Sequence, residues 1–291
     1  IDNCDSPSPK KYEGFVKDSK KWVIFPRLSF ANHIMIEKRN VEIGKDFSTY
    51  SANKAEGVNS EKAVVTSGIS YAYTKECLKD YPDVKLIKIA TAYPFPEDFV
   101  LSSLEGAKEV LCIEELSPFI EEQILKLTGK HGLQLKVSGK LDGKVQAGGE
   151  NSTDKIAAIL GEFLGKDFTA EGYDLSDAPA LPVRPPVLCA GCPHRASFYA
   201  VKQAMKGRKA YFCGDIGCYT LGNAMPLDMV DTCLCMGAGI TMAQGFNHTD
   251  SDGVCFGFVG DSTFFASGIT GVVNAVHNNA DMILCVLDNS T

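Results

Sequence analysis

The feature that most constrains the fold is a regular alternation of short apolar and longer amphipathic segments that begins at Lys62. Strands that alternate with helices in this way form parallel βα units, and chain sterics make their crossovers right-handed. The pattern predicts an open, doubly wound, mostly parallel α/β sheet over residues 61–165. The predicted strands are KAVVTS, VKLIKIA, EVLCIEE and LQLKVSG, and the predicted helices are TKECLKDY, PFPEDFVLSSLEG, PFIEEQILKLTG (ended by Gly129) and TDKIAAILGEFLG.

A second α/β domain is predicted for residues 187–291. It follows residues 166–186, which hold four prolines and no periodicity and are therefore predicted to be a linker. Its predicted strands are KAYFCG, VDTCLC, VCFGFV and MILCVL, with helices after His194, Gly237 and Phe264. Because MILCVL lies at the end of the given sequence, we expect this domain to be truncated at its C-terminus.

Residues 1–60 lack this alternation and are predicted to be a connecting segment. Within it, WVIF predicts a strand and residues 29–44 a helix, while residues 46–62 have the composition of a linker.

Composition limits the classes of function. A net charge of −7 argues against binding to nucleic acid or to an anionic membrane as the main role. The sequence contains no long apolar run of the kind that spans a bilayer, and its first residues lack the pattern of a secretory signal. Several of the 11 cysteines lie inside strand-like runs, as buried thiols do, so we expect a reducing, cytoplasmic location.

Two polar residues follow neighbouring predicted strands near the end of the sequence. Asp261 comes directly after VCFGFVG, and Asn289 follows MILCVL, with 26 residues between Ser262 and Asn289. Ligands of open α/β sheets bind at the carboxyl ends of strands, and carboxylate and amide oxygens suit Mg²⁺ beside a phosphate. The backbone N–H groups of Ser262 and Thr263, at the start of a helix, are suited to phosphate oxygens. The alternative is that Asp261 caps a helix and Asn289 forms a turn.

The segment Gly260-Asp261-Ser262 followed by Asn289 resembles the motif of thiamine-diphosphate enzymes. The resemblance implies that Asp261, the Asn289 side chain and the backbone carbonyl of Thr291 hold Mg²⁺. Met236 and Gly237, in DTCLCMGAGI, resemble the stretch in which a bulky apolar residue supports the bent cofactor. The alternative for Met236 is packing in the core.

Four segments together resemble the α subunit of indolepyruvate:ferredoxin oxidoreductase, a thiamine-diphosphate-dependent family. They are RPPVLCAGCPHR, YFCGDIGCYTLG, DTCLCMGAGI and GDSTFF, and the stretch from TSGISYAYTKE to IEELSPFIEEQ is also similar. The resemblance covers nearly the whole chain as the central portion of such a subunit. It implies a transketolase C-terminal-like fold for residues 61–165 and a diphosphate-binding fold for residues 187–291.

The resemblance implies oxidative decarboxylation of aryl-2-oxoacids with CoA, giving aryl-acetyl-CoA and passing electrons to ferredoxin, as in anaerobic metabolism. It implies thiamine diphosphate, Mg²⁺ and [4Fe-4S] clusters as cofactors, and a hetero-oligomer with a β subunit. In the family a pyrimidine-binding domain comes before these segments and a ferredoxin-like tail after them. We therefore expect the fragment alone to be inactive.

The cysteines near the second domain are candidates for an iron–sulfur cluster. Cys189, Cys192 and Cys218 resemble three ligands of the cluster nearest thiamine in related enzymes, and thiolates are the usual ligands of such clusters. The alternatives are buried thiols, or a Cys218 that lines the cofactor pocket as a catalytic residue. A zinc site is disfavoured because no second CxxC pair is present beside the first.

Three further residues are candidates for the cofactor pocket. His194 and Arg195 lie at the predicted start of a helix, with a capping histidine and a surface arginine as the alternative. His194 is also a candidate catalytic residue. Asp215 follows a predicted strand and either caps a turn or contacts the cofactor.

Two other functions are compatible with these residues. A non-oxidative thiamine-diphosphate-dependent decarboxylase, of the sulfopyruvate or phosphonopyruvate type, would need neither the CxxC pair nor electron transfer. A non-catalytic scaffold would need no intact metal ligands, and Asp261 and Asn289 argue against it.

Overall fold

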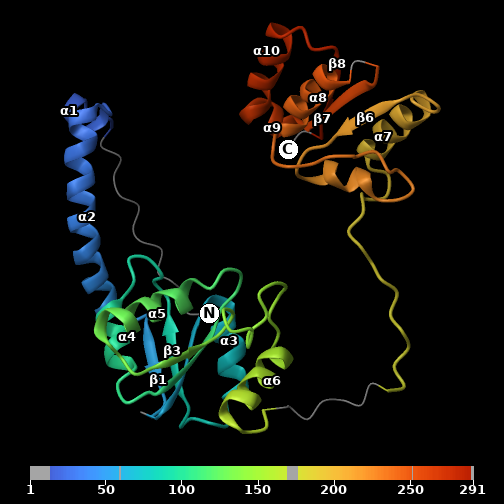
Figure 1. Cartoon of the computed structure of the whole chain (residues 1–291). Helices are drawn as coiled ribbons and strands as arrows, with labels where there is room; N and C mark the ends of the chain where they lie inside the picture. Colours follow the sequence, from blue (N-terminus) through green and yellow to red (C-terminus); the bar gives the residue numbers. More distant parts are fainter. Residues whose placement is uncertain (1–13, 59, 169–175, 251, 290–291) are drawn as a thin grey trace. The chain divides into compact units, whose positions relative to one another are not determined.

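The chain forms two compact units, residues 1–177 and 178–291. The computed structural model describes residues 14–58, 60–168, 176–250 and 252–289. The boundary between the units falls inside the segment predicted as a linker. Both units are α/β with parallel sheets, so the predicted fold class is confirmed (Figure 1).

The sheet of the first unit has the strand order β1-β3-β2-β4-β5. Its parallel strands are β2 (Lys62–Ser67), β3 (Lys85–Ile89), β4 (Glu109–Ile113) and β5 (Lys136–Ser138), which match the four predicted strands. Strand β1 (Lys54–Glu56) pairs antiparallel with β3 at one edge.

Helices cover both faces of this sheet. Side chains of a strand alternate between the two faces, and here apolar side chains on both faces are buried. Ala63 and Val65 of β2 belong to the core beneath α4 (Glu97–Ser103) and α5 (Phe119–His131). Val64, between them, belongs to the opposite core, with α6 (Thr153–Leu164) and residues of α3 (Gly68–Cys77). The near-continuous apolar strands are thus explained by burial on both sides.

Several predictions for the first unit were wrong. WVIF is not a strand, because Trp22 ends the short helix α1 (Ser19–Trp22). The next helix, α2 (Pro26–Thr49), begins at Pro26, whose fixed φ suits the first turn of a helix. The predicted linker holds β1, which is too short to show an alternating pattern. Helix α5 does not end at Gly129 but continues to His131, where Gly132 in the left-handed conformation caps it.

The second unit has a three-stranded parallel sheet in the order β6-β7-β8. Its elements are α7 (Pro193–Ala204), β6 (Ala210–Cys213), the 3₁₀ helix η1 (Cys218–Asn223), α8 (Ala238–Thr249), β7 (Val254–Gly260), α9 (Asp261–Thr263), the π-helical turn η2 (Phe264–Gly268), α10 (Ile269–His277) and β8 (Met282–Leu287). Phe198 of α7 packs on Phe258 of β7 with ring centroids 4.8 Å apart. Ala243 of α8 packs on the other face, against Cys213 and Cys255.

The predicted strand VDTCLC is not formed. Only Thr232 makes an isolated parallel bridge, to Cys213. The reason is a local exchange of hydrogen bonds with β6: the Asp231 N–H donates to the Phe212 carbonyl at 2.8 Å, and the Asp231 carboxylate accepts the Phe212 N–H at 2.7 Å. A side chain thus takes the Phe212 N–H at this edge of β6, and the backbone pairing is limited to Thr232. In the described parts of the chain, no helix is both long and apolar enough to cross a membrane.

We expect Asn53→Ala to destabilise the first unit. The buried Asn53 accepts the N–H groups of Ala90 and Thr91 at 2.7 and 3.3 Å and donates to the Phe47 carbonyl at 2.7 Å. The change leaves part-buried backbone groups without their hydrogen bonds, and loss of such a partner costs at most about 1–3 kcal/mol. Urea unfolding followed by circular dichroism measures the loss. Asn40→Ala, on the partly exposed side of α2, is the control, and an equal loss in both variants would contradict the assignment.

Candidate functional site

The polar residues predicted for a cofactor lie at the carboxyl edge of the second sheet. Strands β7 and β8 are parallel, and Gly260 is in register with Leu287. Asp261 and Asp288 therefore follow their strands at the same level, and Asn289 comes one residue later. The structure brings the two ends together as predicted, and adds Asp288, which the sequence analysis did not consider.

The helix that leaves β7 begins at Asp261. Helix α9, turn η2 and helix α10 run on from one another over residues 261–277, and the first N–H groups of a helix have no partner within it. Ser262 is exposed, whereas the side chain of Thr263 is buried. The exposed backbone at Ser262 is therefore the part of this turn that is open to an anion.

Asp215 links this turn to two others. Its side chain is 0% exposed. Oδ1 accepts the N–H of Gly237 at 2.8 Å and of Ile216 at 3.0 Å, and Oδ2 accepts the N–H of Gly260 at 3.3 Å. One carboxylate thus joins the backbone after β6 to the turn before α8 and to the end of β7.

Met236 lies in the turn that Asp215 holds. Its side chain is 57% exposed, so Met236 is not part of the described core and the alternative of core packing is wrong. The adjacent Gly237 has a φ of +87°, which glycine adopts without strain. Met236 therefore presents an apolar side chain to the surface beside the turn that Asp215 holds.

Tyr219 lies directly over Gly260. A Cβ atom at Gly260 would come within 2.3 Å of the Tyr219 hydroxyl oxygen. Burial raises the pKa of Tyr219, and the nearby Asp261 carboxylate raises it further, so its hydroxyl keeps its proton at neutral pH. The phenol is thus available as a hydrogen-bond donor beside Asp261. Sequence reasoning missed Tyr219 because its position depends on a contact with a glycine of another strand.

His194 contacts the ring of Tyr219 and is connected to this site by that contact. It is 3% exposed, and its ring centroid is 5.0 Å from that of Tyr219. Cys192 precedes α7 as the N-cap residue, so the alternative of a capping His194 is wrong. Arg195 is not a free surface residue either: its Nε donates to the carbonyl oxygens of Leu188 and Cys189 at 3.1 and 2.9 Å, which closes the turn before α7.

The thiols predicted to bind a cluster do not form a metal site in this structure. Cys189 and Cys218 are exposed and Cys192 is partly exposed. Within the described ranges, no three His, Cys, Asp or Glu side chains come close enough to hold a metal ion. By contrast, burial raises the pKa of Cys112 and Cys255 inside their strands, as expected of unreactive core thiols.

The residues predicted to bind Mg²⁺ supply a suitable set of donors. Asp261 offers a carboxylate whose Oδ1 atom is buried, and Asn289 offers an exposed amide oxygen at the end of the adjacent strand. Hard oxygen donors in this arrangement fit Mg²⁺, which usually takes only one or two carboxylates and completes its shell with water and phosphate. The predicted third ligand, the carbonyl of Thr291, lies outside the described residues.

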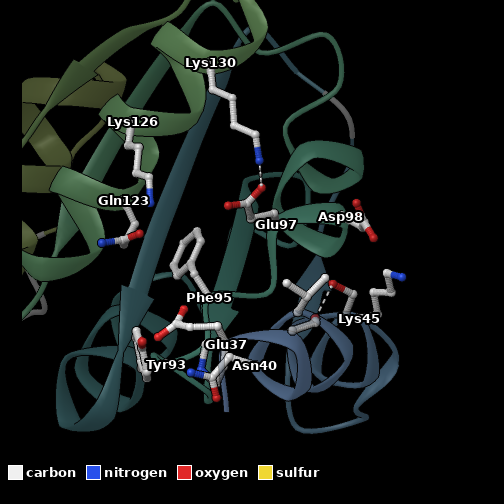
Figure 2. A pocket seen from close by; sticks show the side chains of 14 residues that line it. Glu37, Asn40, Lys45, Tyr93, Phe95, Glu97, Asp98, Gln123, Lys126 and Lys130 are labelled. Atoms are coloured by element: carbon white, nitrogen blue, oxygen red, sulfur yellow. Dashed lines mark hydrogen bonds and ion pairs between the residues drawn. The ribbon is translucent and has the colours of Figure 1, made fainter. Parts of the chain in front are cut away.

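A cavity of about 370 Å³ lies elsewhere, in the first unit between α2, α4 and α5 (Figure 2). Lysines and acids line it in equal measure, and Figure 2 shows Lys130 paired with Glu97. None of the residues predicted for the cofactor lines this cavity. The residues predicted for the cofactor lie instead in the second unit, at the carboxyl edge of its sheet.

Comparisons with known proteins agree with this location. Residues 215–291 match the family "Thiamine pyrophosphate enzyme, C-terminal TPP binding domain". The match begins at Asp215 and includes Tyr219, Met236, Gly260, Asp261 and Asn289, whereas His194 and Arg195 precede it.

The similar curated proteins are archaeal. Proteins named "Indolepyruvate oxidoreductase subunit IorA" are 36% identical over 96% of this chain in Methanothermobacter thermautotrophicus, 35% over 89% in Archaeoglobus fulgidus and 32% over 96% in Thermococcus kodakarensis. The chain covers 46%, 41% and 46% of those proteins, so it spans about half of their length. Among solved structures, Zn(II)-bound AdcA from Streptococcus pneumoniae is matched over 79% of this chain and 51% of that one at 13% identity, and its TM-score of 0.27 supports no conclusion.

We expect Gly260→Ala to displace Tyr219 and to lower the free energy of unfolding by about 1–3 kcal/mol, the usual range for overpacking. Tyr219→Ala removes the obstructing ring, so the glycine change should cost much less in that background. Thermal unfolding of the two single variants and the double variant forms the required cycle. Additive losses would show that the ring does not lie over Gly260.

Proposed function

Because nearly the whole chain is similar to about half of the indolepyruvate oxidoreductase subunit IorA, we propose that it is the thiamine-diphosphate-binding segment of such a subunit. The observation that carries the proposal is the joint position of Asp261 and Asn289 at the ends of β7 and β8, inside the matched cofactor domain. In this proposal the enzyme oxidatively decarboxylates aryl-2-oxoacids such as indolepyruvate with CoA and passes electrons to ferredoxin.

Thiamine diphosphate supplies the electron sink that makes loss of a carboxylate group from a 2-oxoacid possible. The residues of this chain have other tasks. When the cofactor is bound, Asp261 and Asn289 would hold Mg²⁺, and the exposed N–H group of Ser262 would donate to phosphate oxygens. The exposed Met236 supports the cofactor beside Gly237, and the neutral phenol of Tyr219 is placed as a donor next to Asp261.

The thiols and His194 have separate roles in this proposal. Cys218 is exposed just before Tyr219, so it can line the pocket without being a cluster ligand. Cys189, Cys192 and Cys218 stay candidate ligands of an iron–sulfur cluster that would pass electrons towards ferredoxin. His194 positions the Tyr219 ring, because a buried imidazole 5.0 Å from that ring contacts it directly.

The partners follow from the same proposal. Part of the site's surroundings would come from the rest of the subunit, and a β subunit and ferredoxin would complete the assembly in the cytoplasm.

The assay uses the complete complex and measures reduction of an artificial electron acceptor by indolepyruvate, with and without CoA. CoA-dependent reduction is expected. Release of carbon dioxide without reduction of the acceptor would replace this proposal with a non-oxidative decarboxylase.

Asp261→Ala should abolish Mg²⁺-dependent binding of thiamine diphosphate while leaving the fold intact, because Asp261 follows the strand and is outside the apolar core. Calorimetric titration of the complex with the cofactor, with and without Mg²⁺, measures the effect. Asp252→Ala, in the turn that leads into the opposite end of β7, is the matched control and should bind normally. Normal binding by the Asp261 variant would show that the metal assignment is wrong.

A further inference from the structure

We infer that Asp215 is a positioning residue that holds the two cofactor-binding turns in their working arrangement before the cofactor arrives. The inference rests on the proposed function, since it concerns the same site. Of the two roles expected from the sequence, it develops the capping of a turn and sets aside direct contact with the cofactor. The geometry points to a residue that acts through the backbone of Gly237 and Gly260.

The first argument is that both carboxylate oxygens are already engaged by the protein. Oδ1 receives the N–H groups of Gly237 and Ile216, and Oδ2 receives that of Gly260. The side chain is completely buried. A carboxylate in this state has little capacity left for a phosphate, which is itself an anion and would be repelled.

The second argument is what these hydrogen bonds join. Gly237 lies next to Met236, and Gly260 lies next to Asp261, so each bonded N–H group belongs to a turn that carries a proposed cofactor contact. Gly237 also lies close to the helical segment that follows Gly260. A Cβ atom at Gly237 would be 3.1 Å from the Ser267 hydroxyl oxygen and 3.8 Å from the Thr263 methyl group. Their separation is therefore set by contacts within the protein.

The third argument is that Asp215 is itself anchored. Its own carbonyl accepts the Thr220 hydroxyl at 2.7 Å, and the same hydroxyl lies 3.5 Å from the Cys233 sulfur. The segment from Asp215 to Thr220 is thus tied to the loop that precedes Met236. A charged acceptor on a fixed backbone is suited to hold neighbouring N–H groups, because hydrogen bonds to ionised groups are about twice as strong as neutral ones.

The test compares Asp215→Asn with Asp231→Asn in the complete complex. The amide at residue 215 cannot accept at both of its terminal atoms, so at least one turn is released. Asp231 is the matched control because its carboxylate also accepts a backbone N–H, that of Phe212, but joins no cofactor turn. We expect the concentration of thiamine diphosphate needed for half-maximal activity to rise at least tenfold in the Asp215 variant, with kcat at saturating cofactor within threefold of the wild type.

Two results would overturn the inference. An unchanged cofactor requirement in the Asp215 variant would give the side chain no role in positioning. A kcat lost at every cofactor concentration, with unaltered cofactor binding, would make Asp215 a catalytic residue instead. If the wild-type complex itself neither binds nor requires thiamine diphosphate, the proposed function fails, and that result is separate from either of these.

Hydrogen–deuterium exchange of the wild-type complex provides a readout that does not depend on a variant that folds. We expect the N–H groups of Gly237 and Gly260 to be protected in the absence of thiamine diphosphate, because Asp215 already binds them. Rapid exchange of both groups in the cofactor-free enzyme, with protection only after cofactor addition, would contradict the inference.

Discussion

The site of the second unit depends on one buried carboxylate and the three N–H groups that it accepts. Asp215 follows the end of β6, and its carboxylate accepts hydrogen bonds from the turn at Gly237 and from the end of β7 at Gly260. A buried charge is tolerated only where hydrogen bonds replace its hydration. The same bonds that stabilise Asp215 therefore also determine where Met236 and Asp261 lie, and the proposed cofactor site is a consequence of this arrangement.

The register of the parallel sheet determines where the other polar residues of the site lie. Because β7 and β8 are in register at Gly260 and Leu287, oxygen donors that follow the two strands meet at one edge without any loop of special length. Tyr219 adds a constraint from a third element, since its ring occupies the place that a side chain at residue 260 would take. The edge thus combines two oxygen-donor residues, an exposed backbone turn and a neutral phenol.

The sequence was sufficient to predict the parallel strands and the residues that directly follow them, because burial on both faces leaves long apolar runs. Asp261 and Asn289 could therefore be placed at the ends of neighbouring strands. The contacts of Asp215 and Tyr219 could not be predicted, because they involve Gly237 and Gly260, which are distant in sequence. Strand β1 was missed for a related reason: three residues at a sheet edge carry too little pattern to be distinguished from a linker.

The central claim is that the cofactor binds at the carboxyl edge of the second sheet. The most direct measurement is a cryo-electron microscopy structure of the complete complex with thiamine diphosphate and Mg²⁺. The account predicts density for the diphosphate at the backbone of Ser262, with a metal ion between Asp261 and Asn289. A cofactor bound elsewhere, for example in the charged cavity of the first unit, would contradict it.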